Sequence, residues 1–238
     1  MKDDLKGQRF IIAGYGEPLG DAICRMLLSH GAVPLLVARS HETLKNASLR
    51  LEGSDYYPCD LSDDSSLRNL CDHVKEKFGT VRGIVVTVGG FFYDDVRTPG
   101  NTQALVNSNL LVPMKVISSL LGILEKSGSI VFTSSITTLR FSEKNPLSYT
   151  VTKYALNGLT YTLAAELLAN NIRVNAVAIS SISEDYDPHR DWKKMRKLGD
   201  HSTPAEDIAN VVYFLLSDLS EMVDGAVIPV DGGSRFRS

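Results

Sequence analysis

The chain has 238 residues, of which 43% are hydrophobic and 22% charged, and its formal net charge is −3. This composition is ordinary for a globular protein with one sizeable core, and the small acidic surplus argues against a nucleic-acid-binding protein, which usually carries a basic surplus. The three cysteines are scattered and the five histidines show no metal-ligand spacing, so we expect a reducing compartment and no metal.

The N-terminal residues lack the apolar core of a signal peptide. No apolar run approaches the ~18 residues that a membrane span requires. We therefore expect one cytoplasmic domain over residues 1–238, with no membrane partner.

The first elements predict a βαβ unit with a glycine-rich turn. An apolar strand at 9–13 leads into a turn with glycines at 14, 16 and 20, and then into a helix that Gly31 ends. A second apolar run at 33–38 is continuous, as in a parallel sheet covered on both faces. Gly14, Gly16 and Gly20 would let the backbone approach a pyrophosphate at a helix N-terminus, and a plain tight turn is the alternative.

Arg39 and Ser40 directly follow the second strand. In an NAD site, an acidic residue near this position would hold the ribose 2′-hydroxyl, whereas an arginine suits the 2′-phosphate of NADP. An ordinary surface arginine is the alternative interpretation.

The middle of the chain continues the alternation of strands and helices. A short strand at 56–59 ends at Asp60 and Leu61, and a capped helix follows it. A fourth strand at 83–88 ends at Gly89, and an aromatic loop begins at residue 91. The next helix carries Asn109 on or beside its apolar face, where a polar residue with only a structural role is the alternative.

A fifth strand at 129–133 is followed by Ser134 and Ser135, a loop, and a helix that opens on Tyr149. Tyr149 and Lys153 are four residues apart, so they share one face of that helix. A nearby cation lowers the pKa of a phenol, and a tyrosine tuned in this way exchanges a proton near neutral pH. The spacing alone also fits a solvated helix face, so the interpretation depends on the surrounding pattern.

The last third supplies a sixth strand at 173–179, a helix that opens at Thr203 and a final strand at 227–230. The polar segment at about 183–203 is long for a connection, which predicts a lid or substrate loop. Strands and helices alternate throughout the chain. The pattern therefore predicts an α/β fold, a doubly wound parallel sheet with helices on both faces.

From Arg9 to Gly233, the chain resembles a classical short-chain dehydrogenase/reductase, and its pattern is most similar to 3-oxoacyl-acyl-carrier-protein reductases. The motifs that carry this resemblance are Gly14 and Gly20, Asp60-Leu61, Asn109-Leu110 with Pro113, Ser135, Tyr149-x-x-x-Lys153, 171–178, 203–209 and 230–233. The resemblance implies a Rossmann-type domain, an NADP cofactor with NAD as the alternative, a small-molecule substrate, and a homo-oligomer, either a tetramer or a dimer.

The resemblance also implies roles for individual residues. Tyr149 would exchange the proton with the substrate oxygen, Lys153 would lower the pKa of Tyr149 and hold the nicotinamide ribose, and Ser135 would orient the substrate. Asn109 would support a water-linked proton relay. The implied cofactor-binding residues are Gly14, Gly16, Gly20, Arg39, Ser40, Asp60, Leu61, Gly89, Tyr149, Lys153 and Ile182.

Several positions depart from the family pattern. Pro18 replaces the middle glycine of the turn and has no N–H for a phosphate, and the charge of Glu17 would oppose a phosphate nearby. The sequences at 87–90 and 179–180 differ from the motifs that normally meet the nicotinamide. The spacing of 14 from Ser135 to Tyr149 is one longer than usual, so Ser134 is the alternative serine.

Two classes of function follow. The first is an NADP-dependent oxidoreductase acting on a carbonyl or secondary alcohol, either a 3-oxoacyl thioester or a sugar- or polyol-like substrate. A basic cluster would attract an acidic substrate or form a solvated surface: Arg190, Lys193, Lys194, Arg196 and Lys197. The second class, motivated by the altered motifs, is a non-catalytic dinucleotide-binding or structural protein on the same scaffold.

Overall fold

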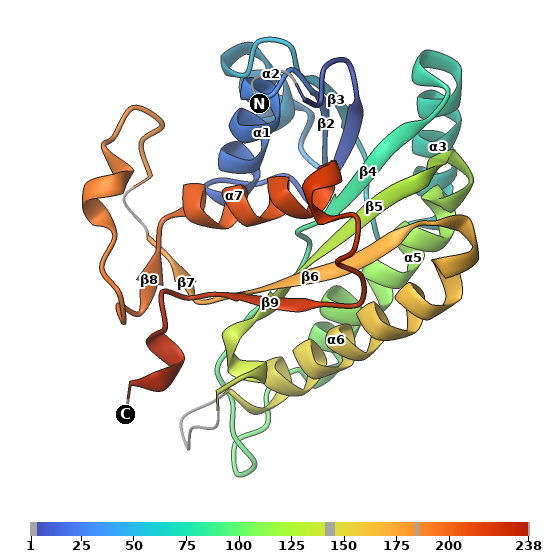
Figure 1. Ribbon diagram of the computed structural model, residues 1–238. Helices are drawn as coiled ribbons and strands as arrows, with labels where there is room; N and C mark the ends of the chain where they lie inside the picture. Colours follow the sequence, from blue (N-terminus) through green and yellow to red (C-terminus); the bar gives the residue numbers. More distant parts are fainter. Residues whose placement is uncertain (1–3, 141–145, 184–185, 238) are drawn as a thin grey trace.

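The computed structural model describes residues 4–140, 146–183 and 186–237 (Figure 1). Its centre is a seven-stranded parallel sheet in the order β3-β2-β1-β4-β5-β6-β9. The strands are β1 (Arg9–Ala13), β2 (Val33–Ala38), β3 (Asp55–Pro58), β4 (Val81–Val86), β5 (Leu124–Ser135), β6 (Arg173–Ile179) and β9 (Val227–Val230). The predicted doubly wound parallel sheet is confirmed.

Helices cover both faces of this sheet (Figure 1). One face carries α1 (Leu19–Ser29), α2 (His41–Arg50) and α7 (Ala205–Leu216), and the other carries α3 (Asp64–Phe78), α5 (Val112–Leu120) and α6 (Leu147–Leu167). Within β1, Phe10 and Ile12 pack in one core and Ile11 and Ala13 in the other. Because both faces of the strands are buried, their sequences are continuous apolar runs.

The direction of winding reverses between β1 and β4, which pair side by side with Ala13 opposite Val86. In open α/β sheets, the crevice at such a reversal, beyond the carboxyl ends of the strands, is where ligands bind. The glycine turn after β1 and the loop after β4 meet at this point, because the Thr87 N–H donates to the Ala13 carbonyl at 2.9 Å.

Two elements differ from the sequence prediction. Helix α2 was not predicted, and its inner face buries only Leu44 and Ala47, so its apolar periodicity is weak. The helix that was predicted around Asn109 contains a π-helical turn, η1 (Asn107–Leu111), between α4 (Thr102–Val106) and α5. Single π-helical turns inside α-helices occur frequently at functional sites.

One segment corrects the expectation about membrane spans. Residues Thr102–Ile123 are long and apolar enough to cross a membrane by length and composition, with a mean hydropathy of 1.4. The inner residues Val116 and Leu120 are nevertheless packed in the core against the sheet, while Leu111 and Met114 on the outer side are partly exposed. The segment is therefore a core helix whose outer face is also partly apolar.

The segment predicted as a lid leaves the sheet through β7 (Ser181–Ile182) and returns through β8 (Ser202–Thr203), and these two strands pair in parallel. Its residues 184 and 185 lie outside the described residues. The remainder stands beside the ends of α1 and α7, at the left of Figure 1.

Candidate active site

Three of the four predicted catalytic residues meet where β5 ends and α6 begins. Ser135 is the last residue of β5, and its hydroxyl hydrogen-bonds the phenol of Tyr149 in the first turn of α6. The Lys153 Nζ lies 5.7 Å from the centre of the Tyr149 ring and donates to the Thr133 carbonyl at 2.9 Å. The strand end and the helix start therefore present a hydroxyl, a phenol and an ammonium together.

Burial dominates the electrostatics of this group. Removal from water lowers the pKa of Lys153 to about 8. Burial likewise raises the pKa of Tyr149, and the hydrogen bond with Ser135 offsets this only in part. The sequence-based expectation was that the lysine charge would lower the pKa of Tyr149, whereas desolvation of the phenolate has the larger effect here. Tyr149 is thus held in its protonated form, ready to donate.

The two serines at the end of β5 point to different partners. The Ser134 Oγ donates to the Asn157 Oδ1 at 2.5 Å, and the Asn157 amide donates to the Thr138 Oγ1 at 3.0 Å. This buried network occupies the Ser134 hydroxyl. The Ser135 Oγ accepts from the Thr137 N–H at 3.2 Å and from the Thr137 hydroxyl at 3.1 Å, and it also hydrogen-bonds Tyr149. Residues 141–145 of the long loop between Ser135 and Tyr149 lie outside the described residues.

Asn109 is fully buried in the π-helical turn and clamps the loop after β4. Its Oδ1 accepts from the Gly90 N–H at 2.8 Å, and its Nδ2 donates to the Gly90 carbonyl and to the Thr152 Oγ1, both at 3.1 Å. A Cβ on Gly89 would lie 2.8 Å from Asn109 Oδ1 and 3.4 Å from Lys153 Nζ. The glycines after β4 therefore allow Asn109 and Lys153 to approach the same backbone.

Two cavities flank Gly14. One holds about 400 Å³ and is lined by residues that include Gly14, Tyr15, Arg39, Asp60, Leu61, Thr87 and Gly89. The other holds about 310 Å³ and is lined by residues that include Gly14, Gly16, Gly20, Thr87, Gly89, Phe91, Tyr149, Lys153 and Ile182. The two cavities differ in size and share the glycine turn as part of their lining. A dinucleotide could place one nucleotide in each cavity and its pyrophosphate at the turn.

Gly14 cannot be replaced without a shift of the backbone. Its φ is +99°, and a Cβ there would lie 2.6 Å from the backbone nitrogen of Val88. Ser40, in contrast, caps α2, because its Oγ accepts from the Thr43 N–H at 3.2 Å. The pKa of Asp60 is lowered by hydrogen bonds from Ser62 and further by the nearby Arg39 guanidinium. Both Asp60 and Arg39 line the larger cavity.

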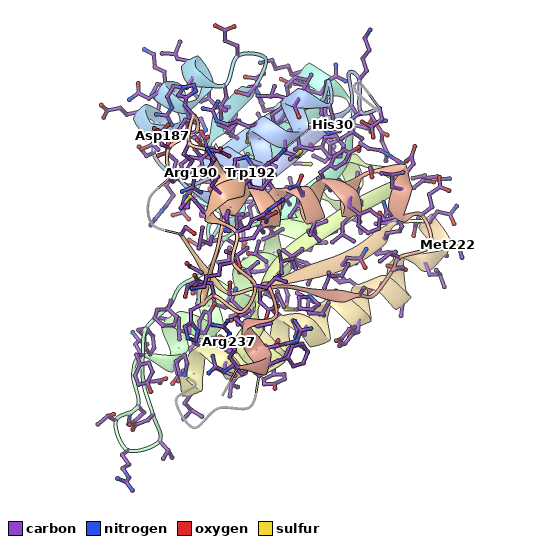
Figure 2. All side chains as sticks on the ribbon, turned by 60° about the vertical axis from the view of Figure 1, so that its left-hand side comes forward. His30, Asp187, Arg190, Trp192, Met222 and Arg237 are labelled. Atoms are coloured by element: carbon purple, nitrogen blue, oxygen red, sulfur yellow. The ribbon has the colours of Figure 1, made fainter. Side chains whose placement is uncertain are left out.

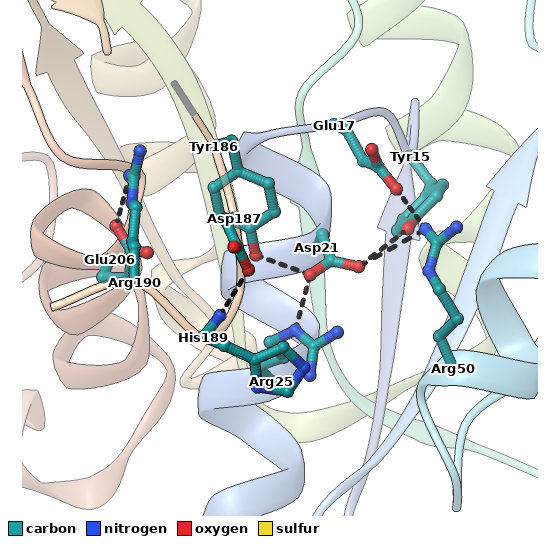
Figure 3. Close-up of polar contacts among 10 residues, drawn as sticks. All are labelled: Tyr15, Glu17, Asp21, Arg25, Arg50, Tyr186, Asp187, His189, Arg190 and Glu206. Carbon is teal, nitrogen blue, oxygen red and sulfur yellow. Dashed lines mark hydrogen bonds and ion pairs between the residues drawn. The ribbon is translucent and has the colours of Figure 1, made fainter. Parts of the chain in front are cut away.

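The acidic residues of the glycine turn are paired (Figure 3). The buried carboxylate of Asp21 accepts from Arg25 Nε at 2.6 Å and from the Tyr186 hydroxyl at 2.5 Å. Glu17 forms an ion pair with Arg50 of α2. These contacts partly offset the negative charge that Glu17 and Asp21 bring to a phosphate site. The i, i+4 spacing of Asp21 and Arg25 was the one sequence signal for this cluster.

A residue that sequence reasoning missed fastens the loop after β4 to α6. The carboxylate of Asp94 accepts from the N–H of Ser148 at 2.9 Å and from its hydroxyl at 2.5 Å, and it also accepts from the Gly100 N–H at 3.1 Å. The hydrogen bonds from Ser148 lower the pKa of Asp94. Pro146, at the N-cap of α6, provides no side-chain cap. Asp94, from a distant part of the chain, caps the helix instead, through its hydrogen bonds with Ser148. Ser148 is the residue before Tyr149.

Three of the five residues of the basic cluster in the lid segment form ion pairs with acidic neighbours. Arg190 pairs with Glu206 at 3.0 Å, and Lys194 pairs with Asp191 at 3.0 Å. The Nε of Arg196 donates to both carboxylate oxygens of Asp207, at 2.9 Å each. Arg190 and Trp192 lie over the ends of α1 and α7, on the side of the molecule that Figure 2 brings forward. The cluster is therefore tied to α7 and to its own segment.

Comparisons with known proteins agree with this geometry. A family model described as enoyl-(acyl carrier protein) reductase matches residues 14–235. A 3alpha-hydroxysteroid dehydrogenase of Mediterraneibacter gnavus is 30% identical over 97% of this chain and 98% of its own. The 3-oxoacyl-[acyl-carrier-protein] reductase FabG of Thermotoga maritima is 29% identical over 96% of this chain and 98% of its own.

Among solved structures, a blue fluorescent protein from a metagenomic library, in complex with NADPH, is similar in fold. Its TM-score is 0.84 and its sequence identity is 25%, and the match covers 97% of this chain and 98% of that one. The likeness thus extends over both cavities and over the segment between β7 and β8.

Proposed function

Because the chain belongs to the short-chain dehydrogenase/reductase family of oxidoreductases, we propose that it is an NADP-dependent enzyme that interconverts a carbonyl group and a secondary alcohol. The observation that carries this proposal is that Tyr149 and Lys153 line the smaller cavity beside the glycine turn, with Ser135 hydrogen-bonded to Tyr149. In this proposal the smaller cavity holds the nicotinamide, and Tyr149 is the proton donor beside it.

The residues present fit a dinucleotide. Gly14 lines both cavities, and its missing Cβ lets the loop after β4 pack against the glycine turn, along which a pyrophosphate would lie. Asp60 and Leu61 would flank the adenine, and Lys153 would reach the nicotinamide ribose. Arg39 would bind the 2′-phosphate of NADP, and the Glu17–Arg50 pair reduces the opposing charge. The NADPH complex of the similar fluorescent protein supports this cofactor, with NAD as the alternative.

The protein side of the chemistry follows from the contacts. The bound nicotinamide supplies the two-electron exchange, and the protein positions the substrate and moves the proton. In the reductive direction, Tyr149 donates its proton to the substrate oxygen, and Ser135 hydrogen-bonds the same oxygen as charge develops on it. The Lys153 ammonium, fixed on the Thr133 carbonyl, stabilises the phenolate that remains.

The sequence pattern suggests a 3-oxoacyl thioester or a sugar- or polyol-like compound as substrate. The similar proteins include a hydroxysteroid dehydrogenase and a 3-oxoacyl-[acyl-carrier-protein] reductase. Each of these compounds has a ketone or a secondary alcohol that could react at Tyr149. They differ in the rest of the molecule, which the substrate site would have to recognise.

We also propose that the enzyme assembles as a homo-oligomer through α6. Partly exposed apolar residues form a stripe on its outer face: Leu147, Val151, Tyr154 and Tyr161. A Cβ on Gly158, within the same stripe, would meet nothing, so another helix can approach closely there. An apolar face on an already packed helix needs a second partner.

The alternative is a non-catalytic dinucleotide-binding or structural protein on the same scaffold, and it rests on Pro18 and on the altered motifs after β4 and β6. A Tyr149→Phe variant separates the two functions. The oxidation of NADPH would be followed by absorbance with an acetoacetyl thioester, dihydroxyacetone and 2-decalone. We expect Tyr149→Phe to lose about 100-fold or more in turnover, because the proton donor is gone, and to keep its affinity for NADPH.

Tyr154→Phe, on the outer side of the same helix, is the matched control and should retain turnover. Unreduced turnover in Tyr149→Phe would contradict the assigned proton donor. A wild-type protein that binds NADPH but reduces none of the three carbonyl probes would favour the non-catalytic alternative.

A further inference from the structure

The loop after β4 places one aromatic ring against the proposed proton donor. The ring of Phe91 meets the ring of Tyr149 edge to face, with centroids 4.9 Å apart and an interplanar angle of 77°. Phe91 lines the smaller cavity and yet is 65% exposed. A large apolar side chain that is exposed to water beside a reactive hydroxyl offers a surface on which an apolar ligand can pack.

The position of Phe91 is fixed from both sides. On one side, Asn109 holds both backbone groups of Gly90, the preceding residue. On the other side, Asp94 is fastened to Ser148 at the start of α6. The backbone that carries Phe91 is therefore anchored on both sides, which lowers the entropic cost to a ligand that packs on its ring.

The charged side chains near Phe91 already interact with other groups of the protein. Two charged residues line the smaller cavity in the described part of the chain: Glu17, which pairs with Arg50, and Lys153, whose ammonium donates to the Thr133 carbonyl. The apolar side chains of Ile179 and Ile182 form another part of the lining. Such a surface gives no charged partner to a phosphate or a carboxylate on the substrate.

The basic cluster that would attract an acidic carrier also has internal partners. Arg190 and Arg196 are bound to Glu206 and Asp207 of α7, and Lys194 is bound to Asp191. An acidic carrier would have to compete with these carboxylates for the arginines. The charge argument for a phosphopantetheine thioester is weakened accordingly.

We propose that Phe91 is a specificity-determining residue, which selects an uncharged, ring-bearing ketone or secondary alcohol over polyols and carrier thioesters. This inference rests on the proposed oxidoreductase function. In the reductive direction, an alicyclic ketone, NADPH and one proton give the alicyclic alcohol and NADP⁺. The apolar ring of the substrate packs on Phe91, while its oxygen reaches Tyr149 and Ser135.

The test compares three probes and two variants. The probes are 2-decalone, acetoacetyl-N-acetylcysteamine and dihydroxyacetone, each with NADPH. We expect wild-type kcat/KM to be at least about tenfold higher for 2-decalone than for the other two. Phe91→Ala should lose about tenfold for 2-decalone, chiefly through KM, and change little for dihydroxyacetone. Tyr93→Ala is the matched control, since Tyr93 is 63% exposed in the same loop and does not line the cavity.

A binding measurement makes the inference independent of turnover. Calorimetric titration of 2-decalol into the protein with NADPH, an alcohol and a reduced cofactor that cannot react with each other, should give binding that is about tenfold weaker in Phe91→Ala and unchanged in Tyr93→Ala. A higher kcat/KM for the thioester or the polyol, or equal binding of 2-decalol by both variants, would overturn the role of Phe91 and leave the oxidoreductase proposal standing. Absence of turnover with all three probes would instead count against the oxidoreductase proposal, and the binding result would still decide the role of Phe91.

Discussion

At the scale of single residues, the burial of the charged Lys153 side chain, which its proposed role requires, lowers the stability of the folded protein. Its ammonium is buried, and desolvation lowers its pKa from 10.5 to about 8. Below pH 8, the folded protein must hold a charge that water would solvate better in the unfolded chain. Between about pH 8 and 10.5, the unfolded chain keeps a proton that the folded protein releases, so the contribution of Lys153 to stability rises with pH.

Lys153→Met should therefore be more stable than the wild type at pH 7, by roughly 1–3 kcal/mol, while losing activity. The excess stability should shrink as the pH rises from about 8 to 10.5. Urea unfolding of both proteins across this range measures the difference, and titrations elsewhere in the chain cancel in it. Lys75→Met, at the surface of α3, is the control and should show no such trend. A difference that is independent of pH would count against a buried ammonium.

The predictability of the site from sequence varied from residue to residue. Spacing was sufficient to expect Tyr149 and Lys153 on one helix face, because that geometry is local. It could not show that burial outweighs the lysine charge at Tyr149, because desolvation depends on packing by distant segments. The structure brings Ser135 to Tyr149 and turns Ser134 to Asn157, and no local pattern distinguishes these two adjacent serines.

At the scale of elements, most strands followed from their apolar runs, and β1, β2, β6 and β9 begin and end at the predicted residues. Strands that are buried on both faces are easy to predict, because their sequences are continuous apolar runs. Helix α2 was missed because it rests on the sheet with only two buried residues. The N-cap of α6 was missed because Asp94 and Ser148 are 54 positions apart in the chain. Local capping patterns do not detect such a pair.

At the scale of the whole molecule, the outer face of α6 is exposed in the part of the chain that the structure describes. We predict that the protein in solution has a mass above the 26.1 kDa of one chain, as a dimer or a tetramer. Val151→Arg, in the exposed apolar stripe, should reduce the mass towards that of one chain, because it places a charge at a desolvated helix contact. Light scattering on eluted protein measures this mass.

Leu49→Arg is the matched control for assembly, since Leu49 is an exposed leucine on α2, on the opposite face of the sheet. It should leave the mass unchanged. A wild-type protein with the mass of one chain would exclude the proposed contact through α6.

The central claim is that the cavities on both sides of Gly14 bind NADP, and the titration of purified protein with NADPH and NADH, followed by nicotinamide fluorescence, tests it most directly. We predict tighter binding of NADPH, and a loss of this preference by about tenfold in Arg39→Ala, which removes a charged hydrogen bond to the 2′-phosphate. A preference for NADH would show that Glu17 outweighs Arg39 in spite of its pairing with Arg50. No binding of either nucleotide would contradict the account and favour a non-catalytic, structural protein on the same scaffold.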